Sequence, residues 1–193
     1  MIDLTPTTER TSAVVAAVTD DQLEAPTPMG QPVRMVIHHL LGLSVAFRDA
    51  AAKVTGPTTS TPPGPVEGPL PEGWRSELEK LLFELSNAWR SADAWEGMTM
   101  AGGFELPAEV CGMVATDEVL LHGWDVARAT GQPYRPTDAE CEAVLPIVTP
   151  EAEAPDGSGR DGIFGTVVDL PADAPFFDRV LGLAGRDPAW SAD

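Results

Sequence analysis

Apolar residues recur at intervals of three and four along four segments of the chain, a spacing typical of amphipathic helices. The third segment is the clearest, because its leucines share one side while glutamate and lysine residues occupy the other. Pro32 precedes the second segment and Gly131 ends the fourth, and helices commonly begin after proline and end at glycine. The four predicted helices span residues 7–19, 33–54, 74–94 and 107–131.

The remaining segments are short or rich in proline and glycine. Residues 55–73 predict a surface loop, and a Gly-Gly pair predicts the turn of a short hairpin within residues 98–106. The last part of the chain predicts a helix, a loop, a strand and a final helix at residues 138–145, 149–165, 166–170 and 174–184. We therefore expect a mainly α protein: a four-helix bundle of residues 1–136 with one long connection, and a small C-terminal extension of residues 137–193 packed on it.

Length and composition indicate one domain. The chain has 193 residues, 43% of them apolar, which suffices for a hydrophobic core. No uninterrupted apolar run approaches the roughly 18 residues that a membrane span needs. The first residues include Asp3 and Glu9 and lack the basic-then-apolar start of a signal peptide. We therefore expect a cytoplasmic protein that does not bind a membrane.

Charge and cysteine content exclude other classes of function. Thirty acidic against twelve basic side chains give a net charge of −18, which would repel a phosphate backbone, so we expect no nucleic-acid partner. Cys111 and Cys141 form no CxxC pair, which argues against a cysteine zinc site or a disulfide framework and predicts reduced thiols. The chain lacks GxSxG, P-loop and HExxH motifs, and we interpret the glycines within residues 156–159 as a flexible loop.

Histidine is rare here, and all three histidines lie in two of the apolar predicted helices. Glu118 lies four residues before His122, so on a helix both side chains project from one face, one turn apart. A third imidazole from the second helix would give a site of two imidazoles and one carboxylate. Such a set leaves coordination positions of a divalent cation open for chemistry.

Helical geometry, at about 100° per residue, distinguishes the two adjacent histidines of the second helix. His39 shares its stripe with apolar residues and therefore points inward, where an imidazole needs a polar partner. His38 is rotated away toward Arg34, nearer to a boundary face. We therefore predict His39, Glu118 and His122 as the metal ligands.

The same side chains also have structural interpretations that involve no metal. A Glu/His pair at this spacing is a common contact on helix surfaces, and a single inward imidazole is commonly a hydrogen-bonded core residue. Asp125, one turn beyond His122, is predicted to hold the second imidazole nitrogen, to act as a catalytic base, or to pair with Arg128. For Cys111 and Trp124, core packing is the simpler interpretation.

Two stretches of the sequence resemble one known family. Residues 33–40 and residues 118–131, the latter with the run His-Gly-Trp-Asp at 122–125, are similar to the DinB-like superfamily. The resemblance is greatest to its actinobacterial branch, which includes mycothiol-dependent maleylpyruvate isomerase. Residues 164–165, 171–175 and 185–190 resemble the tail of the same branch, so the resemblance extends over nearly the whole chain. The His-Gly-Trp-Asp run is its most specific part.

This resemblance implies a DinB-like four-helix bundle with a divalent metal on a His–Glu–His triad, which corresponds here to His39, Glu118 and His122. Zinc is the favoured ion, with nickel, cobalt, iron and manganese as alternatives. Characterised members use the open metal face to activate a low-molecular-weight thiol. The chain departs from the family within residues 30–32, where relatives commonly have a tryptophan, and at Met35, where they commonly have an acidic residue.

We therefore predict a metal-dependent enzyme of the thiol transferase or isomerase type, with mycothiol as the favoured cosubstrate on the resemblance alone. Its partners would be a small thiol and a small electrophilic molecule, and it would be a monomer or a homodimer. Metal-assisted hydrolysis, with Asp125 as the base, is the second interpretation. A non-catalytic bundle that binds a metal or a small molecule is the third.

Overall fold

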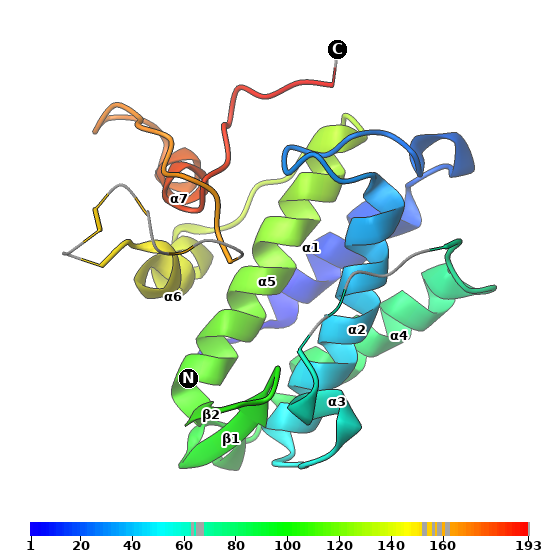
Figure 1. Ribbon diagram of the computed structural model, residues 1–193, viewed down its shortest axis with the longest axis vertical. Helices are drawn as coiled ribbons and strands as arrows, with labels where there is room; N and C mark the ends of the chain where they lie inside the picture. The colour runs from blue at the N-terminus through cyan, green and yellow to red at the C-terminus, as the bar shows by residue number, and fades with distance from the viewer. Residues whose placement is uncertain are drawn as a thin grey trace.

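Four long helices form the body of the computed structural model, which describes residues 1–62, 64, 68–151, 154, 155, 157, 160 and 163–192. These helices are α1 (Thr5–Ala16), α2 (Val33–Ala51), α4 (Trp74–Ala88) and α5 (Ala108–Ala129). Both α1 and α2 pack against α4 and α5, so the α2–α5 pair forms one side of the bundle and the α1–α4 pair the other (Figure 1). The predicted four-helix bundle is confirmed.

Proline and glycine residues set the ends of these helices. Pro6 lies in the first turn of α1, while Pro32 and Pro107 immediately precede α2 and α5. Proline is tolerated there because the first N–H groups of a helix have no partner within it. Gly131, with a φ of +70°, follows the end of α5, where an L side chain would be strained. These boundaries place the candidate ligands well inside α2 and α5.

Shorter elements connect the bundle helices. They are η1 (Asp20–Gln22), α3 (Pro57–Ser60), η2 (Ala92–Trp95), β1 (Met98–Ala101) and β2 (Phe104–Pro107). The two strands form the predicted hairpin, an antiparallel pair in which Ala101 lies opposite Phe104. The long connection before α4 contains α3 and is therefore not entirely loop. The third predicted helix was too long, because α4 ends at Ala88 and the chain continues into η2.

The C-terminal part of the chain packs on the bundle. It contains α6 (Asp138–Val148) and α7 (Phe176–Leu183), which lie on the side of α5 away from α2 in Figure 1. Helix α6 contacts α5, and α7 contacts α6. A capping box begins α6, because the Thr137 hydroxyl accepts from the Glu140 N–H while the Glu140 carboxylate accepts from the Thr137 N–H. A division into two domains at residue 136 stays a prediction.

One predicted element is wrong. Residues 166–170 form no strand, and no other strand lies beside them in the described part of the chain. Their backbone instead contacts α7, where the Val168 N–H donates to the Gly182 carbonyl at 2.9 Å. The Leu170 side chain also lies beside Gly182, so this segment packs against α7 instead of a strand. Part of the predicted loop 149–165, including Ser158 and Gly159, lies outside the described residues.

The hydrophobic core contains residues from all four bundle helices. Gly123 of α5 allows α1 to lie close to α5. A Cβ atom at Gly123 would overlap the hydroxyl groups of Thr11 and Tyr134, so glycine lets α1 lie close to α5. Within the described residues no helix has both the length and the hydropathy to cross a membrane. The largest fully buried side chains include Leu4, Ile37, Leu40, Leu78, Leu82, Leu85, Trp89, Leu120, Leu121 and Leu181.

Candidate metal centre

Glu118 and His122 face each other across one turn of α5. The Glu118 Oε2 atom lies 3.2 Å from His122 Nε2. Because the two residues are four apart on a regular helix, the backbone itself brings their side chains together. One rigid element therefore supplies two of the three predicted ligands.

His39 joins this pair from the neighbouring helix α2. Its Nε2 atom lies 3.7 Å from Glu118 Oε2, and its ring centroid lies 5.0 Å from that of His122, with the ring planes at 87°. One donor atom from each of the three residues lies within 4.8 Å of the others, and no other such group occurs among the described residues. The side chains are 29%, 26% and 19% exposed for His39, Glu118 and His122, so the cluster opens to solvent.

The spacing of these donors fits a divalent cation. Two ligand atoms that each lie about 2.1 Å from a metal, at angles between octahedral and tetrahedral, are about 3.0–3.4 Å apart. The distances from Glu118 Oε2 to the two imidazole nitrogens, 3.2 and 3.7 Å, lie close to this range. Three protein donors at a solvent-facing position leave room for a further ligand, as in catalytic rather than structural zinc sites.

His38 points away from the cluster. Its Nε2 atom lies 3.1 Å from the Pro69 carbonyl oxygen, in the segment that leads to α4. Adjacent residues on a helix differ by about 100° in direction, so only one of the two neighbouring histidines can face Glu118. The structure brings His39 to that position, as the stripe geometry predicted. That these three residues bind a metal stays a prediction.

Electrostatic coupling within the cluster is strong. Burial raises the pKa of Glu118, but hydrogen bonds from His122 and His39 outweigh this and hold the pKa well below its ordinary value. Burial lowers the pKa of His122, but hydrogen bonds to Asp125 and Glu118 raise it to about 9. Glu118 is therefore a carboxylate held ionised by its imidazole partners, and its negative charge suits a metal cation.

Asp125 lies beyond His122 on the same side of α5 and is fully buried. Its Oδ2 atom lies 3.0 Å from His122 Nδ1, which is one of the contacts expected from the sequence. The alternative ion pair with Arg128 is wrong, because the Arg128 Nε donates to the Trp190 carbonyl oxygen. The orienting arrangement is thus present, and His122 keeps Nε2 toward Glu118.

The charged partner of Asp125 is Arg186, which the sequence reasoning missed. The Nε and Nη2 groups of Arg186 donate to Oδ1 and Oδ2 of Asp125 at 2.9 and 2.8 Å. Burial raises the pKa of Asp125, but the charge of Arg186 and the hydrogen bond from His122 bring it below its ordinary value. The two residues are 61 positions apart, and no helical periodicity links them.

Four further buried residues of α5 and α6 are not among the three donors. Cys111 is a free, buried thiol whose pKa burial raises to about 12, so it is a poor nucleophile at neutral pH. Trp124 and Cys141 are also buried. Asp117, which the sequence reasoning did not single out, is 3% exposed, and its Oδ1 atom has no hydrogen-bond partner in the described part of the chain. It is not one of the three donors.

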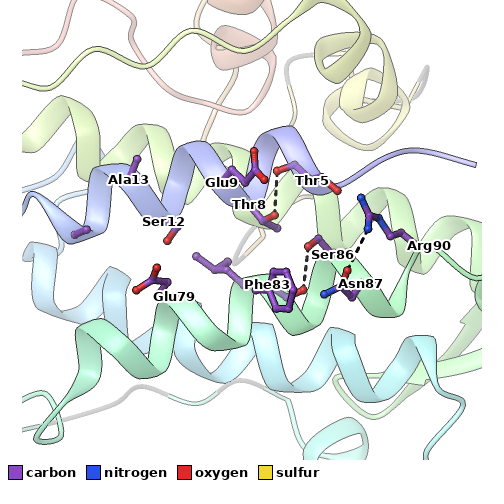
Figure 2. Close-up of a pocket in the computed structure, with 12 residues that line it drawn as sticks. Thr5, Thr8, Glu9, Ser12, Ala13, Glu79, Phe83, Ser86, Asn87 and Arg90 are labelled. Atoms are coloured by element: carbon purple, nitrogen blue, oxygen red, sulfur yellow. Dashed lines mark hydrogen bonds between the residues drawn. The ribbon is translucent and has the colours of Figure 1, made fainter.

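A groove of about 420 Å³ runs between α1 and α4 (Figure 2). Glu79 and Phe83 line it from α4, Arg90 from the turn that follows α4, and threonine, serine and alanine residues from α1. It contains no histidine or cysteine and lies across the bundle from the α2–α5 pair that carries the three donors. The groove is therefore separate from the metal centre.

Comparison with known proteins gives one family. The model of the mycothiol maleylpyruvate isomerase N-terminal domain matches residues 4–127, which contain His39, Glu118 and His122. Two solved structures are similar: mycothiol-dependent maleylpyruvate isomerase and a histidine-to-alanine mutant of it. Each has a TM-score of 0.52 and 18% identity, covering 76% of this chain and 67% of the other. No curated protein matches significantly. The likeness establishes the DinB-like helical fold.

Proposed function

The chain belongs to the family of the mycothiol maleylpyruvate isomerase N-terminal domain, and on that premise we propose a metal-dependent enzyme that activates a low-molecular-weight thiol. The observation that carries the proposal is the convergence of one donor atom each from His39, Glu118 and His122 within 4.8 Å at a solvent-facing position. Two nitrogens and one carboxylate oxygen suit zinc, and we favour zinc over nickel, cobalt, iron and manganese.

Each residue has a distinct role in this proposal. His39 and His122 supply neutral nitrogen ligands, and Glu118 supplies the negative charge that partly balances a divalent cation. Asp125 accepts a hydrogen bond from His122 Nδ1 and so leaves Nε2 available on the other side of the ring. Asp125 does not face the opening, because it is 0% exposed and paired with Arg186. We assign it a positioning role in place of the catalytic role that the sequence suggested.

The thiol chemistry follows from the open position. A bound divalent cation lowers the pKa of a thiol ligand, so that the thiolate, which is the nucleophile, is available near neutral pH. The protein supplies no thiolate of its own near the cluster, because Cys111 is buried and its pKa is raised to about 12. The nucleophile is therefore a small external thiol. Mycothiol is the favoured one on family membership, and the second substrate is a small electrophile for isomerisation or thiol transfer.

Metal-assisted hydrolysis receives less support than thiol chemistry. It requires a carboxylate near the open position that can remove a proton from water. Asp125 was the candidate, but both of its oxygens accept hydrogen bonds from Arg186, and one also faces His122. A carboxylate with these partners is poorly placed to act as a base.

Metal content is the first test. Protein purified without an affinity tag is analysed for metals, stripped with a chelator and titrated with Zn²⁺. We expect about one equivalent per chain, with Glu118→Gln and His39→Ala weakened and His38→Ala unchanged. If the parent takes up no divalent cation on reconstitution, the enzyme proposal fails and the non-catalytic bundle becomes the better interpretation.

Thiol binding is the second test. Mycothiol is titrated into cobalt-substituted protein, because sulfur ligation produces a strong charge-transfer absorption that oxygen ligation does not. The control is the same titration with the hydroxyl analogue of the thiol. We expect the band with the thiol only. Its absence at saturating thiol, in a protein that holds cobalt, would reject thiol activation and return hydrolysis to consideration.

A further inference from the structure

A buried arginine from the end of the chain reaches the metal centre indirectly. The side chains of Arg186 and Asp125 are 4% and 0% exposed. Two guanidinium nitrogens of Arg186 donate to the two carboxylate oxygens of Asp125, at 2.9 and 2.8 Å. Such a two-point contact fixes the plane of the carboxylate as well as its position.

The backbone around Arg186 is equally fixed. Helix α7 ends at Leu183. Gly185, two residues later, has a φ of +76°, and the Arg186 N–H donates to the Leu181 carbonyl at 2.8 Å. This is the hydrogen bond of a Schellman cap, which places the residue after the glycine in one direction. A Cβ at Gly185 would overlap the backbone of Gly165, so only glycine fits this turn. The end of α7 therefore directs the Arg186 side chain toward Asp125 of α5.

The carboxylate that Arg186 holds is the one that contacts a candidate ligand. Asp125 Oδ2 accepts from Arg186 Nη2 and lies 3.0 Å from His122 Nδ1. On the far side of the same ring, His122 Nε2 lies 3.2 Å from Glu118 Oε2. A continuous set of contacts thus leads from the C-terminal segment through Asp125 to the nitrogen that faces the cluster.

We propose that Arg186 is a positioning residue of the metal centre, acting through Asp125 to set the ring orientation and tautomer of His122. The inference rests on the proposed function and deepens it. The family model matches residues 4–127. The inference therefore assigns part of the site to a segment that follows the matched residues. The C-terminal extension is then part of the functional unit and not merely a cover for α5.

Loss of Arg186 would change the site through Asp125. Asp125 becomes a buried carboxylate without its cationic partner, which is strongly unfavourable. Asp125 then moves from its present position, and His122 loses its fixed orientation. Outer partners of metal-bound histidine contribute about 10–100-fold to metal affinity. Lysine keeps the charge but not the two-point geometry, so it restores only part of the effect.

The test compares two arginines of the full-length protein that each form a two-point pair with a buried carboxylate. Arg10 forms a two-point pair with Glu140 that joins α1 to α6 and makes no contact with the cluster. Arg10→Met is therefore a matched control for Arg186→Met. Zn²⁺ affinity is measured by competition with a chromophoric chelator, and the ligand field is recorded in the cobalt-substituted proteins. We expect Arg186→Met to bind Zn²⁺ about 10–100-fold more weakly with altered cobalt bands, Arg186→Lys to be intermediate, and Arg10→Met to match the parent.

Equal Zn²⁺ affinity and equal cobalt spectra in Arg186→Met and Arg10→Met would overturn the inference. If Arg186→Met does not fold, Arg186→Lys decides the question by the same two measurements. If the parent binds no metal, the proposed function fails, and the positioning is then read from imidazole ¹⁵N NMR of the metal-free proteins. Loss of the hydrogen-bonded His122 Nδ1 signal in the Arg186 variants alone supports the inference, and its persistence in them overturns it.

Discussion

Two glutamates, Glu140 and Glu118, show how a carboxylate in this fold becomes either a structural link or a candidate ligand. Glu140 on α6 is 5% exposed and accepts five hydrogen bonds, two from Arg10, one from Thr7 and two from Thr137. Glu118 on α5 is 26% exposed and faces two imidazoles, at 3.2 and 3.7 Å. All the contacts of the Glu140 carboxylate are hydrogen bonds to structural partners, whereas the Glu118 carboxylate faces groups that can also bind a metal.

The kind of partner therefore separates the two residues better than burial or acidity does. Both have a lowered pKa, since donors outweigh the effect of burial in each case, and that of Glu140 falls to about 2. The guanidinium, the two hydroxyl groups and the backbone N–H around Glu140 donate to both of its carboxylate oxygens, so they leave no coordination site. Imidazole nitrogens can give up their protons and bind a metal together with the carboxylate. The following substitutions should separate the two roles.

The largest effect is expected for Glu118→Gln. The amide keeps the shape but loses the charge, and it is a poorer ligand, so Zn²⁺ affinity should fall by one to several orders of magnitude, about 1.4 kcal/mol for each factor of ten. Competition with a chromophoric chelator measures this affinity. Glu109→Gln, at an exposed position of α5, is the control, and unchanged Zn²⁺ binding in Glu118→Gln would reject the ligand role.

The opposite result is expected for Glu140→Gln. It leaves the Arg10 guanidinium, whose side chain is 20% exposed, without its charged partner, and should lower the free energy of unfolding by about 3 kcal/mol. Zn²⁺ affinity should not change, because Glu140 contacts none of the three donors. Urea unfolding at pH 7 tests the first statement. Glu142→Gln, at an exposed position of the same helix, should remain within about 0.5 kcal/mol of the parent; an equal loss in both variants would contradict the special role of Glu140.

Lowering the pH should also weaken the Glu140–Arg10 pair, with a somewhat smaller effect on the free energy of unfolding. The pKa of Glu140 falls on folding from 4.5 to about 2, so its contribution is fully present above pH 4.5 and is lost as the pH falls toward 2. Between pH 6 and pH 3 the parent should therefore lose about 2 kcal/mol more unfolding free energy than Glu140→Gln does. Urea unfolding of both proteins at the two pH values gives this difference. Parallel losses in the two proteins would show that the Glu140 pair does not carry this pH dependence.

The smallest effect is expected for His38→Ala. Its ring contacts the Pro69 carbonyl on the outer side of α2, so Zn²⁺ affinity should stay within about twofold of the parent. His39→Ala, one position along, should lose most of the affinity. Calorimetric titration of both metal-free variants with Zn²⁺ makes the comparison. The reverse result would mean that the face of α2 has been assigned wrongly.

The part of the centre that follows from helical periodicity was predictable from the sequence. Glu118 and His122 are placed together by their spacing, and the apolar stripe of α2 distinguishes His39 from His38. The same reasoning gave the four bundle helices and the hairpin. It depends on contacts within one element or on the inward face of an element, and both are local properties of the pattern.

Contacts between distant segments were not predictable in this way. Arg186 meets Asp125 across 61 positions, and Arg10 meets Glu140 across 130, without a pattern that links either pair. The strand expected at 166–170 failed for a related reason, since short apolar runs pack equally well on a helix. Only the capping box at the start of α6 left a readable signal, a threonine three residues before a glutamate.

The run His-Gly-Trp-Asp at residues 122–125 has a consequence for grafting this centre into other bundles. Successive helical residues point about 100° apart, so its members meet different parts of the protein. The histidine faces Glu118, the glycine admits Thr11 and Tyr134, and the aspartate binds Arg186. A transplanted run would carry one ligand without its neighbours. A working chimera needs the first helix and the tail from the same parent, so this short motif can be exchanged between relatives only together with segments at both ends of the chain.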